Sequence, residues 1–391
     1  MDKLIAALLS QLDAEEIARR ACELLAIPSP TGDSAAVTDY YADRLTELGL
    51  EVHRDEEFAG SPSVIAYVNG AHPGPTLELA GHLDVIPVAQ EPPYRAGDLL
   101  YGRGACDMKG PMAAVLEVTR LLAGVRQHMH GRLMVCAYGL HEAPLGRGQS
   151  LLRLIARGNI GDAVICVEGP DDALAITGRG MCTYEISIAG PGDPVHELQA
   201  TADTPHPLLI GLDVAAMLRD WATELRAGPT LPYVGTESLF IGQFESGDFY
   251  NRVPGHCRIV GTRRYAPGRR FDEVLAEFEQ RLEAIRRTTA TPIRLTLTKT
   301  RDGFRTAEDD RLVQALQAAY QETVGAALPL AAFAAVGDAS LFANEGGRPA
   351  VYFGCGLERA HATPEYVSLA RLARQARVLT AAAARYLGIT A

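Results

Sequence analysis

Polar side chains that could bind metal ions recur at the ends of short apolar runs. The runs TLELAGHLDVI, RLMVCAYGL, DAVICV and PAVYFG resemble buried strands, and each opens into a polar or Gly-rich turn. The residues concerned are His82 with Asp84, Asp107, His141 with Glu142, Glu168, and His361 in the loop after the last run. Each has an ordinary structural alternative, such as a buried His–Asp pair or a helix cap at Asp107. Their repeated position at strand ends favours one shared site instead.

The residue types indicate which chemistry such a site could perform. Two imidazoles and three carboxylates suit a pair of divalent ions that share a bridging carboxylate. The candidate ligands are His82, Asp107, Glu142, Glu168 and His361. Asp84 could hold the second ring N–H of His82 and so fix its tautomer. Two ions about 3.5–4 Å apart can acidify a shared water and polarise a carbonyl, so the predicted chemistry is hydrolysis.

The elements that must position these residues form two patterns. Residues 1–178 alternate helical patterns with apolar runs, which predicts an α/β sheet with helices on its faces. Ligand sites in such sheets lie where strands end in loops. The next stretch has the order strand, helix, strand, strand, helix, strand, which predicts a small α+β domain. We expect a catalytic domain formed by residues 1–178 and 297–391, interrupted by an inserted domain of residues 179–296.

The composition argues against several other classes of protein. The formal net charge is −11 and the basic residues are dispersed, which disfavours nucleic acid as a partner. No apolar run approaches the roughly 18 residues that cross a membrane. Residues 1–20 are predicted to form an amphipathic helix rather than a signal peptide. The seven cysteines are scattered without a C-x-x-C pair, so we expect a reducing, cytoplasmic location. No nucleotide-binding glycine motif or P-loop is present.

Several of these strings occur together in one known family. GHLDVIPV, YGRGACDMKGPMAA, VEGPDD and AHATPEYV resemble, in order, the metal-binding motifs of the M20 metallopeptidases and deacylases, which include acetylornithine deacetylases, succinyl-diaminopimelate desuccinylases and carboxypeptidase G2-like enzymes. NRVPGHCRIVGTRRYAPG is similar to elements of that family's lid domain. The resemblance implies a zinc-peptidase-like catalytic domain with a mixed sheet flanked by helices. It also implies an inserted α+β lid or dimerisation domain, and therefore a homodimer.

The resemblance assigns each candidate ligand to a metal. His82 and Glu168 would bind one ion, Glu142 and His361 would bind the other, Asp107 would bridge them, and Asp84 would orient His82. The cofactors implied are two divalent ions, with zinc expected first and cobalt or manganese as alternatives.

The resemblance also implies substrate contacts in the inserted domain. Arg264 would pair with a substrate carboxylate, which suits the planar fork of arginine. Asn251 would contact the substrate or the oxyanion. A histidine that stabilises the tetrahedral intermediate, in many members across a dimer, would be His196, with His206 as a rival. For both histidines an exposed loop residue is a nearly equal alternative.

One position departs from the family's pattern. The family usually has two adjacent glutamates after the third strand, the first a general base and the second a metal ligand, but this chain has His141-Glu142-Ala143. Either His141 takes the base position and Glu142 is the ligand, or Glu142 is the base and one metal lacks a ligand. We favour the first, because it keeps the ligand set and histidine is a plausible base near neutral pH.

The predicted function is hydrolysis of a small N-acyl amino acid with a free carboxylate. A dipeptidase or carboxypeptidase would cleave the same kind of bond and remains an alternative. A metal-binding homologue that does not hydrolyse its ligand is the alternative from another class, because of the changed base position. Gly337, Asp338 and Gly354 resemble loop elements of the family, although Gly-Asp is common in ordinary turns.

Overall fold

The computed structural model describes residues 3–190, 192, 195–289 and 291–389. The chain divides into two compact units. The larger comprises Met1–Thr177, Arg305–Phe333 and Gly337–Ala391, and the smaller comprises Gly178–Phe304 with Ala334–Val336. Along the chain, the smaller unit lies between segments of the larger one. Each unit has its own hydrophobic core.

The larger unit is built on a mixed nine-stranded sheet, in the order β1-β2-β6-β3-β7-β15-β8-β13 with β14 beside β8. This confirms the predicted fold class. Its strands are β1 (Val52–Asp55), β2 (Ser63–Asn69), β3 (His72–His82), β6 (His130–Tyr138), β7 (Ala163–Cys166), β8 (Leu174–Gly178), β13 (Phe304–Arg305), β14 (Leu330–Phe333) and β15 (Ala350–Tyr352). A separate small sheet contains β4 (Tyr94–Ala96), β5 (Leu99–Tyr101) and β16 (Tyr366–Ser368).

The helices of the larger unit pack against the large sheet or against one another through buried apolar residues. They are α1 (Lys3–Leu9), α2 (Ala14–Ala26), α3 (Ala35–Glu47), α4 (Lys109–Ala123), α5 (Gln149–Ala156), α8 (Arg311–Val324), α9 (Ala339–Asn344) and α10 (Leu369–Tyr386), with a short 3-10 turn at Arg126–His128. The α4 helix is buried along almost all of its length, between the sheet and the helices α2 and α10. None of the helices in the described part of the chain combines the length and the apolar character needed to cross a membrane.

Four neighbouring strands of this sheet run in the same direction. The β3 strand pairs in parallel with both β6 and β7, and β7 pairs in parallel with β15. Each of these strands is buried over its final residues, as expected for strands covered on both faces. The carboxyl ends of parallel strands meet at one edge of the sheet. The loops that follow β3, β6, β7 and β15 therefore begin at the same edge.

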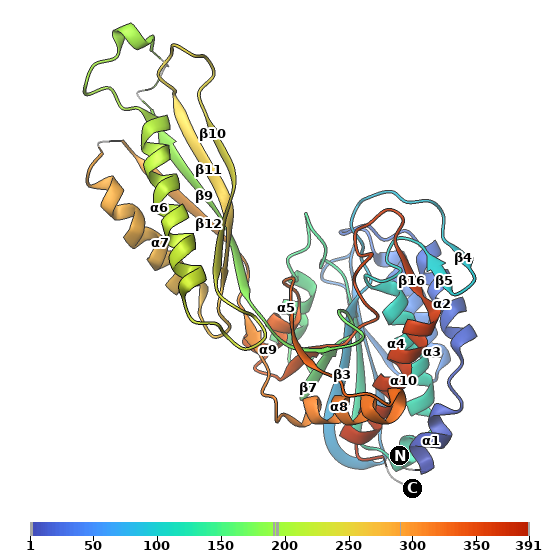
Figure 1. The fold of residues 1–391 in the computed structure, drawn as a ribbon. Helices are drawn as coiled ribbons and strands as arrows, with labels where there is room; N and C mark the ends of the chain where they lie inside the picture. Colours follow the sequence, from blue (N-terminus) through green and yellow to red (C-terminus); the bar gives the residue numbers. More distant parts are fainter. Residues whose placement is uncertain (1–2, 191, 193–194, 290, 390–391) are drawn as a thin grey trace. The chain divides into compact units, whose positions relative to one another are not determined.

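The smaller unit has the predicted order of elements. Its elements are β9 (Gly180–Ala189), a 3-10 turn (Glu197–Gln199), α6 (Pro207–Ala227), β10 (Ser238–Ser246), β11 (His256–Tyr265), α7 (Phe271–Arg286) and β12 (Ile293–Arg301). The antiparallel sheet has the order β10-β11-β9-β12, and Figure 1 shows α6 and α7 side by side on one of its faces. In the core between sheet and helices, the ring of Phe278 packs against Tyr184 at a tilt and against Trp221 edge to face.

Two local features differ from the sequence-based expectations. The N-terminal segment forms two helices rather than one, because the Asp13 carboxylate accepts hydrogen bonds from the N–H groups of Glu15 and Glu16 and so starts a second helix. The second boundary of the inserted unit, expected near residue 296, falls within β12. That strand pairs with β9 as far as Arg301, which keeps it in the smaller unit.

One buried acid links two strands that carry site residues. Glu78 on β3 is fully buried, and one of its carboxylate oxygens, Oε2, accepts a hydrogen bond from the N–H of Gly161 (2.7 Å), shortly before β7. Within the described chain, its other oxygen has no hydrogen-bond partner. Burial raises the pKa of Glu78 to about 7. The folded protein therefore retains a proton here that the unfolded chain releases at lower pH.

This proton predicts a pH-dependent effect of Glu78→Gln. Because the folded pKa lies above the unfolded one, stability is retained at low pH and lost as the pH rises through 7. The neutral glutamine should match the native protein near pH 5 and exceed its stability by about 3 kcal/mol near pH 8. Urea unfolding of both proteins at the two pH values measures the difference.

Glu117, which is also buried but paired with Arg120, provides a matched control. Glu117→Gln should not show the gain at pH 8. A constant stability difference between Glu78→Gln and the native protein across this range would contradict the prediction.

Candidate metal centre

The loops after the parallel strands bring the five candidate ligands to one site in the larger unit. His82 is the last residue of β3, Glu142 follows β6, Glu168 follows β7, and His361 lies between β15 and β16. Asp107 lies in the turn before α4, where Met108 rather than Asp107 takes the capping position and makes no side-chain cap bond. The helix-cap alternative for Asp107 therefore has no support in the structure.

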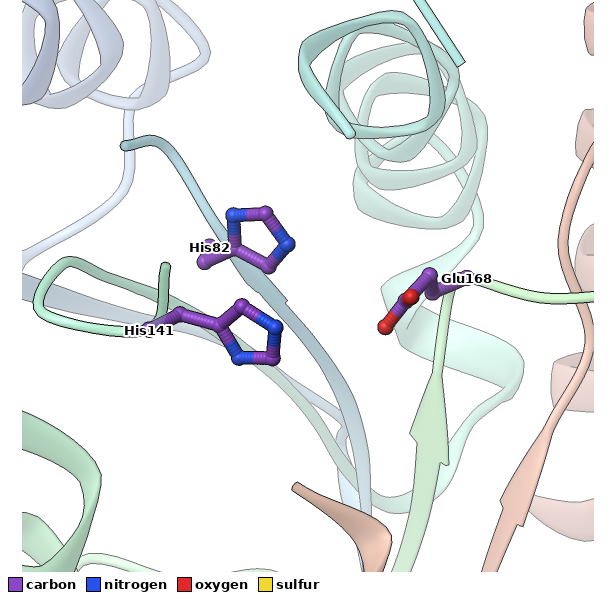
Figure 2. Close-up of side chains that lie close together, drawn as sticks. All are labelled: His82, His141 and Glu168. Carbon is purple, nitrogen blue, oxygen red and sulfur yellow. The ribbon is translucent and has the colours of Figure 1, made fainter. Parts of the chain in front are cut away.

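Asp107 lies between two imidazoles. Its Oδ1 is 3.1 Å from Nε2 of His82, and its Oδ2 is 3.4 Å from Nε2 of His361. Glu142 Oε1 is 3.0 Å from the same His361 nitrogen. Figure 2 shows the rings of His82 and His141 one above the other, both facing the carboxylate of Glu168. Potential ligand atoms of His82, Asp107 and Glu142 lie within 4.8 Å of one another. The same holds for potential ligand atoms of His82, His141 and Glu168.

Asp84 acts differently from the predicted carboxylate–imidazole bond. The backbone carbonyl oxygen of Asp84 is 2.9 Å from Nδ1 of His82, whereas its nearest carboxylate oxygen is 3.7 Å away. The other carboxylate oxygen accepts hydrogen bonds from the N–H groups of His141 (3.1 Å) and Glu142 (2.9 Å), and from the Thr31 hydroxyl. Asp84 thus holds the His82 ring through its main chain and the His141-Glu142 segment through its side chain.

Glu365 is a positioning group that the sequence reasoning missed. One of its carboxylate oxygens accepts hydrogen bonds from the N–H groups of Cys106 (3.1 Å) and Asp107 (3.2 Å), and the other pairs with Arg103 (2.8 Å). Glu365 lies four residues after His361, so its side chain connects the loop of His361 to the backbone at Asp107. In the sequence, only its position inside the motif AHATPEYV could have indicated that Glu365 belongs to the site.

Asp338 is the second residue whose contact was not foreseen. Its Oδ2 lies 2.6 Å from Nδ1 of His141, and its side chain is almost completely buried. The only signal in the sequence was the Gly337-Asp338 pair, which is common in turns. The partner of His141 is 197 positions away along the chain, so spacing could not reveal it.

The electrostatics of the cluster follow from buried carboxylates lying beside imidazoles. Burial opposes the charged form of His82, but Asp107, Asp84 and Glu142 raise its pKa well above the ordinary value. Burial raises the pKa of Asp107, but hydrogen bonds from His361 and His82 bring that pKa well below its usual range. Hydrogen bonds to Asp107 and Glu142 raise the pKa of His361 to about 10.

Burial and neighbouring charges also shift the pKa values of Glu168 and His141. Burial, with Asp107 nearby, raises the pKa of Glu168 to about 7. Burial lowers the pKa of His141, but Asp338 raises it to about 9 overall. Buried carboxylates of this kind favour positive charge in the space between them.

The donor set fits divalent cations. Its nitrogen and carboxylate oxygen atoms are the ligands that zinc prefers. His82, Asp107, Glu142 and Glu168 are buried, whereas His361 is exposed. Bound cations would replace the protons that the imidazoles hold, because metal ligands must be deprotonated. The two oxygens of Asp107 face imidazoles on different sides, which is the arrangement a bridging carboxylate requires.

The substrate-binding candidates lie in the smaller unit. The side-chain amide of Asn251 lies 3.1 Å from Nε2 of His196, while Nδ1 of His196 accepts a hydrogen bond from the N–H of Leu198. The His196 side chain is exposed and Asn251 is half-buried. Arg264 lies near the C-terminal end of β11 and donates a hydrogen bond to the carbonyl oxygen of Ala334 (3.2 Å). His206 precedes α6, and its Nδ1 is buried without a hydrogen-bond partner among the described residues.

Comparison with known proteins agrees with the fold and the donor set. A sequence profile of Peptidase family M20/M25/M40 matches residues 79–385, which include every candidate ligand. The succinyl-diaminopimelate desuccinylase of Methylorubrum populi is 27% identical over 385 residues, covering 93% of this chain and 96% of that protein.

Solved structures share the fold at lower sequence identity. The aminopeptidase PepT from Bacillus cereus has a TM-score of 0.81 at 20% identity, covering 96% of this chain and 99% of its own. The YXEP protein of Bacillus subtilis, a dinuclear metal-binding peptidase from the M20 family, has a TM-score of 0.70 at 16% identity and covers 98% of this chain and 99% of its own. The profile match extends over most of the sequence. The chain therefore belongs to peptidase family M20/M25/M40 and is a metal-dependent hydrolase that acts on amide bonds.

Proposed function

We propose that the protein binds two divalent ions and hydrolyses the amide bond of a small N-acyl amino acid that carries a free carboxylate. The observation that carries this proposal is the position of Asp107, whose two oxygens face His82 and His361 on opposite sides. A carboxylate in that position suits two ions better than one. The relationship to succinyl-diaminopimelate desuccinylases supports an N-acyl amino acid as the substrate class.

The proposed ligand assignment follows the same geometry. His82 and Glu168 would hold one ion, Glu142 and His361 would hold the other, and Asp107 would be the ligand shared by both. Zinc is the expected ion, with cobalt or manganese as alternatives, because imidazole and carboxylate together form a borderline-hard ligand set. When bound, such a pair of ions supplies polarisation of the substrate carbonyl and acidification of the attacking water.

His141 is the proposed proton-transfer residue, and Glu142 is the proposed ligand. The contact between Glu142 and His361 (3.0 Å) supports the ligand role, since both side chains would face the same ion. The His141 ring lies within the cluster of His82 and Glu168. In hydrolysis it would take a proton from the attacking water and deliver it to the nitrogen of the leaving amine.

Arg264 is proposed to select the substrate carboxylate, and His196 with Asn251 to stabilise the oxyanion. Arg264 lies near one end of β11 and Asn251 lies before the other end. A strand rises about 3.3 Å per residue, so the eight residue-to-residue steps from His256 to Arg264 alone span roughly 26 Å. One small substrate cannot reach both groups of a single smaller unit. The proposal therefore includes a homodimer in which a second copy supplies His196 and Asn251.

Metal content and turnover of two variants test the core of the proposal. We expect about two metal ions per native chain and cleavage of at least one member of a panel of N-acetyl amino acids, N-succinyl amino acids and dipeptides. His141→Ala should keep both ions and lose turnover by 10²-fold or more, on the order of a general-base contribution. Glu142→Ala should lose about one ion.

The panel also separates the alternatives. Preference for dipeptides over N-acyl amino acids would place the enzyme among the dipeptidases. Full turnover by His141→Ala would contradict the role of His141, and one ion per native chain would contradict the bridged pair.

The role of Arg264 predicts a dependence on the charge of the substrate. Arg264→Ala should lower kcat/KM by about 10- to 100-fold for a substrate with a free carboxylate, because a charge-assisted hydrogen bond contributes about 1.5–3 kcal/mol. The same substrate as its methyl ester should be affected far less. Equal losses on the acid and the ester, measured by steady-state kinetics, would argue against carboxylate recognition by Arg264.

Mixing two impaired variants tests the dimer. His196→Ala and Arg264→Ala proteins, unfolded and refolded together, should regain activity, because a mixed dimer contains one site with both residues intact. Each variant refolded alone serves as the control and should keep its own reduced activity. Activity no higher than the sum of the controls, in a sample shown to contain mixed dimers, would mean that both residues act within one chain.

A further inference from the structure

The imidazole of His141 is held on two sides. Its Nδ1 is 2.6 Å from Oδ2 of Asp338, and its ring stacks on His82 with 4.0 Å between the ring centroids and 1° between the planes. His82 is itself fixed, because its Nδ1 is 2.9 Å from the backbone carbonyl oxygen of Asp84. The backbone N–H of His141 is bound by the Asp84 carboxylate. Both the main chain and the ring of His141 therefore have defined positions.

Asp338 comes from a different part of the larger unit and is buried. It lies at the start of α9, next to Ala339, whose N–H donates to the hydroxyl of the buried Tyr352 (2.9 Å). The α9 helix packs against β15 and β7, the strands that also position the loops of His361 and Glu168. The Asp338 carboxylate is thus attached to the same rigid sheet edge as the candidate ligands.

The stacking decides between two roles for His141. One of its nitrogens is close enough to His82 and Glu168 for His141 to be considered a ligand. An imidazole nitrogen, however, binds a metal along its lone pair, which lies in the ring plane. Two parallel rings stacked face to face have no common point in their planes, so both cannot bind one ion in this arrangement. His141 therefore does not share the ion of His82.

We propose that Asp338 is a positioning residue that keeps His141 in the tautomer protonated at Nδ1, with the lone pair of Nε2 directed toward the metal cluster. A carboxylate has only acceptor oxygens, so its bond to Nδ1 requires the ring to donate there. Cations bound nearby would disfavour a second proton on the ring, because like charges repel. The single proton of the neutral ring is then at Nδ1, and Nε2 can accept a proton. Figure 2 shows the distal edge of the His141 ring facing Glu168, which is the direction that this role needs.

This inference rests on the proposed function, in which His141 moves the proton. It adds that a histidine–aspartate pair replaces the single carboxylate usual at this position. A glutamate base needs no partner to set its protonation site, whereas a histidine has two tautomers and only one of them leaves Nε2 free. In Ser-His-Asp enzymes, replacing the aspartate by asparagine leaves the wrong tautomer and lowers kcat by about 10⁴.

Asp338→Asn tests the proposal in the zinc-loaded enzyme. We expect kcat to fall by 10²-fold or more, with KM changed less than about threefold and the zinc content unchanged. The matched experiment introduces Asp338→Asn into a His141→Glu variant, whose carboxylate has no tautomer to fix. There the asparagine should cost less than about threefold in kcat. Equal losses in the two backgrounds would assign Asp338 a structural role and overturn the proposal.

A spectroscopic readout is independent of turnover. In two-bond ¹H–¹⁵N spectra of histidine-labelled, zinc-loaded protein, His141 should be protonated at Nδ1 in the native chain and at Nε2 in Asp338→Asn. Its signals are assigned by their loss in His141→Gln. With ¹¹³Cd in place of zinc, the metal should couple to His82 and His361 but not to His141. A cadmium coupling at His141, or an unchanged tautomer in Asp338→Asn, would overturn the proposal. An enzyme that cleaves none of the tested amides would refute the proposed function and leave these spectra decisive for Asp338.

Discussion

The mutual repulsion of three buried carboxylates is the constraint on which the rest of the site depends. Asp107, Glu142 and Glu168 meet at one edge of the large sheet, where water is largely excluded. Charges of one sign in such a place are stable only when opposite charge lies between them. The raised pKa of His361 and the lowered pKa of Asp107 both show that opposite charges stabilise each other here. A cation of higher charge satisfies it better than protons do, which explains why these groups can be retained.

Holding such groups together requires a rigid frame, and the frame consists mainly of bonds to the main chain. Asp84 binds two consecutive N–H groups beside Glu142, and Glu365 binds two consecutive N–H groups at Asp107. Both carboxylates accept hydrogen bonds from the backbone. Asp84 thereby fixes the main chain at Glu142, and Glu365 fixes the main chain at Asp107. The parallel strands supply the common edge, and these two residues supply the local alignment.

Much of this arrangement could be predicted from the chain alone. The apolar runs before His82, Glu142 and Glu168 are long enough to identify strands, and the order of elements in the smaller unit follows from their periodicity. The break between α1 and α2 was missed because the helical pattern of apolar residues continues across Asp13. Aspartate is favoured at the N-terminal cap of a helix and disfavoured in its interior. The partners Asp338 and Glu365 were missed because their contacts join loops that are distant in the sequence, and such pairing is set by the sheet order.

The distribution of the ligands along the chain has a consequence for how the protein is made. His82, Asp107, Glu142 and Glu168 all precede the smaller unit, and His361 follows it. Chains leave the ribosome from the N-terminus, and domains generally fold as units while they emerge. Four candidate ligands are therefore synthesised before β15 and His361. The complete set of five candidate ligands can come together only after the smaller unit and β15 have been synthesised.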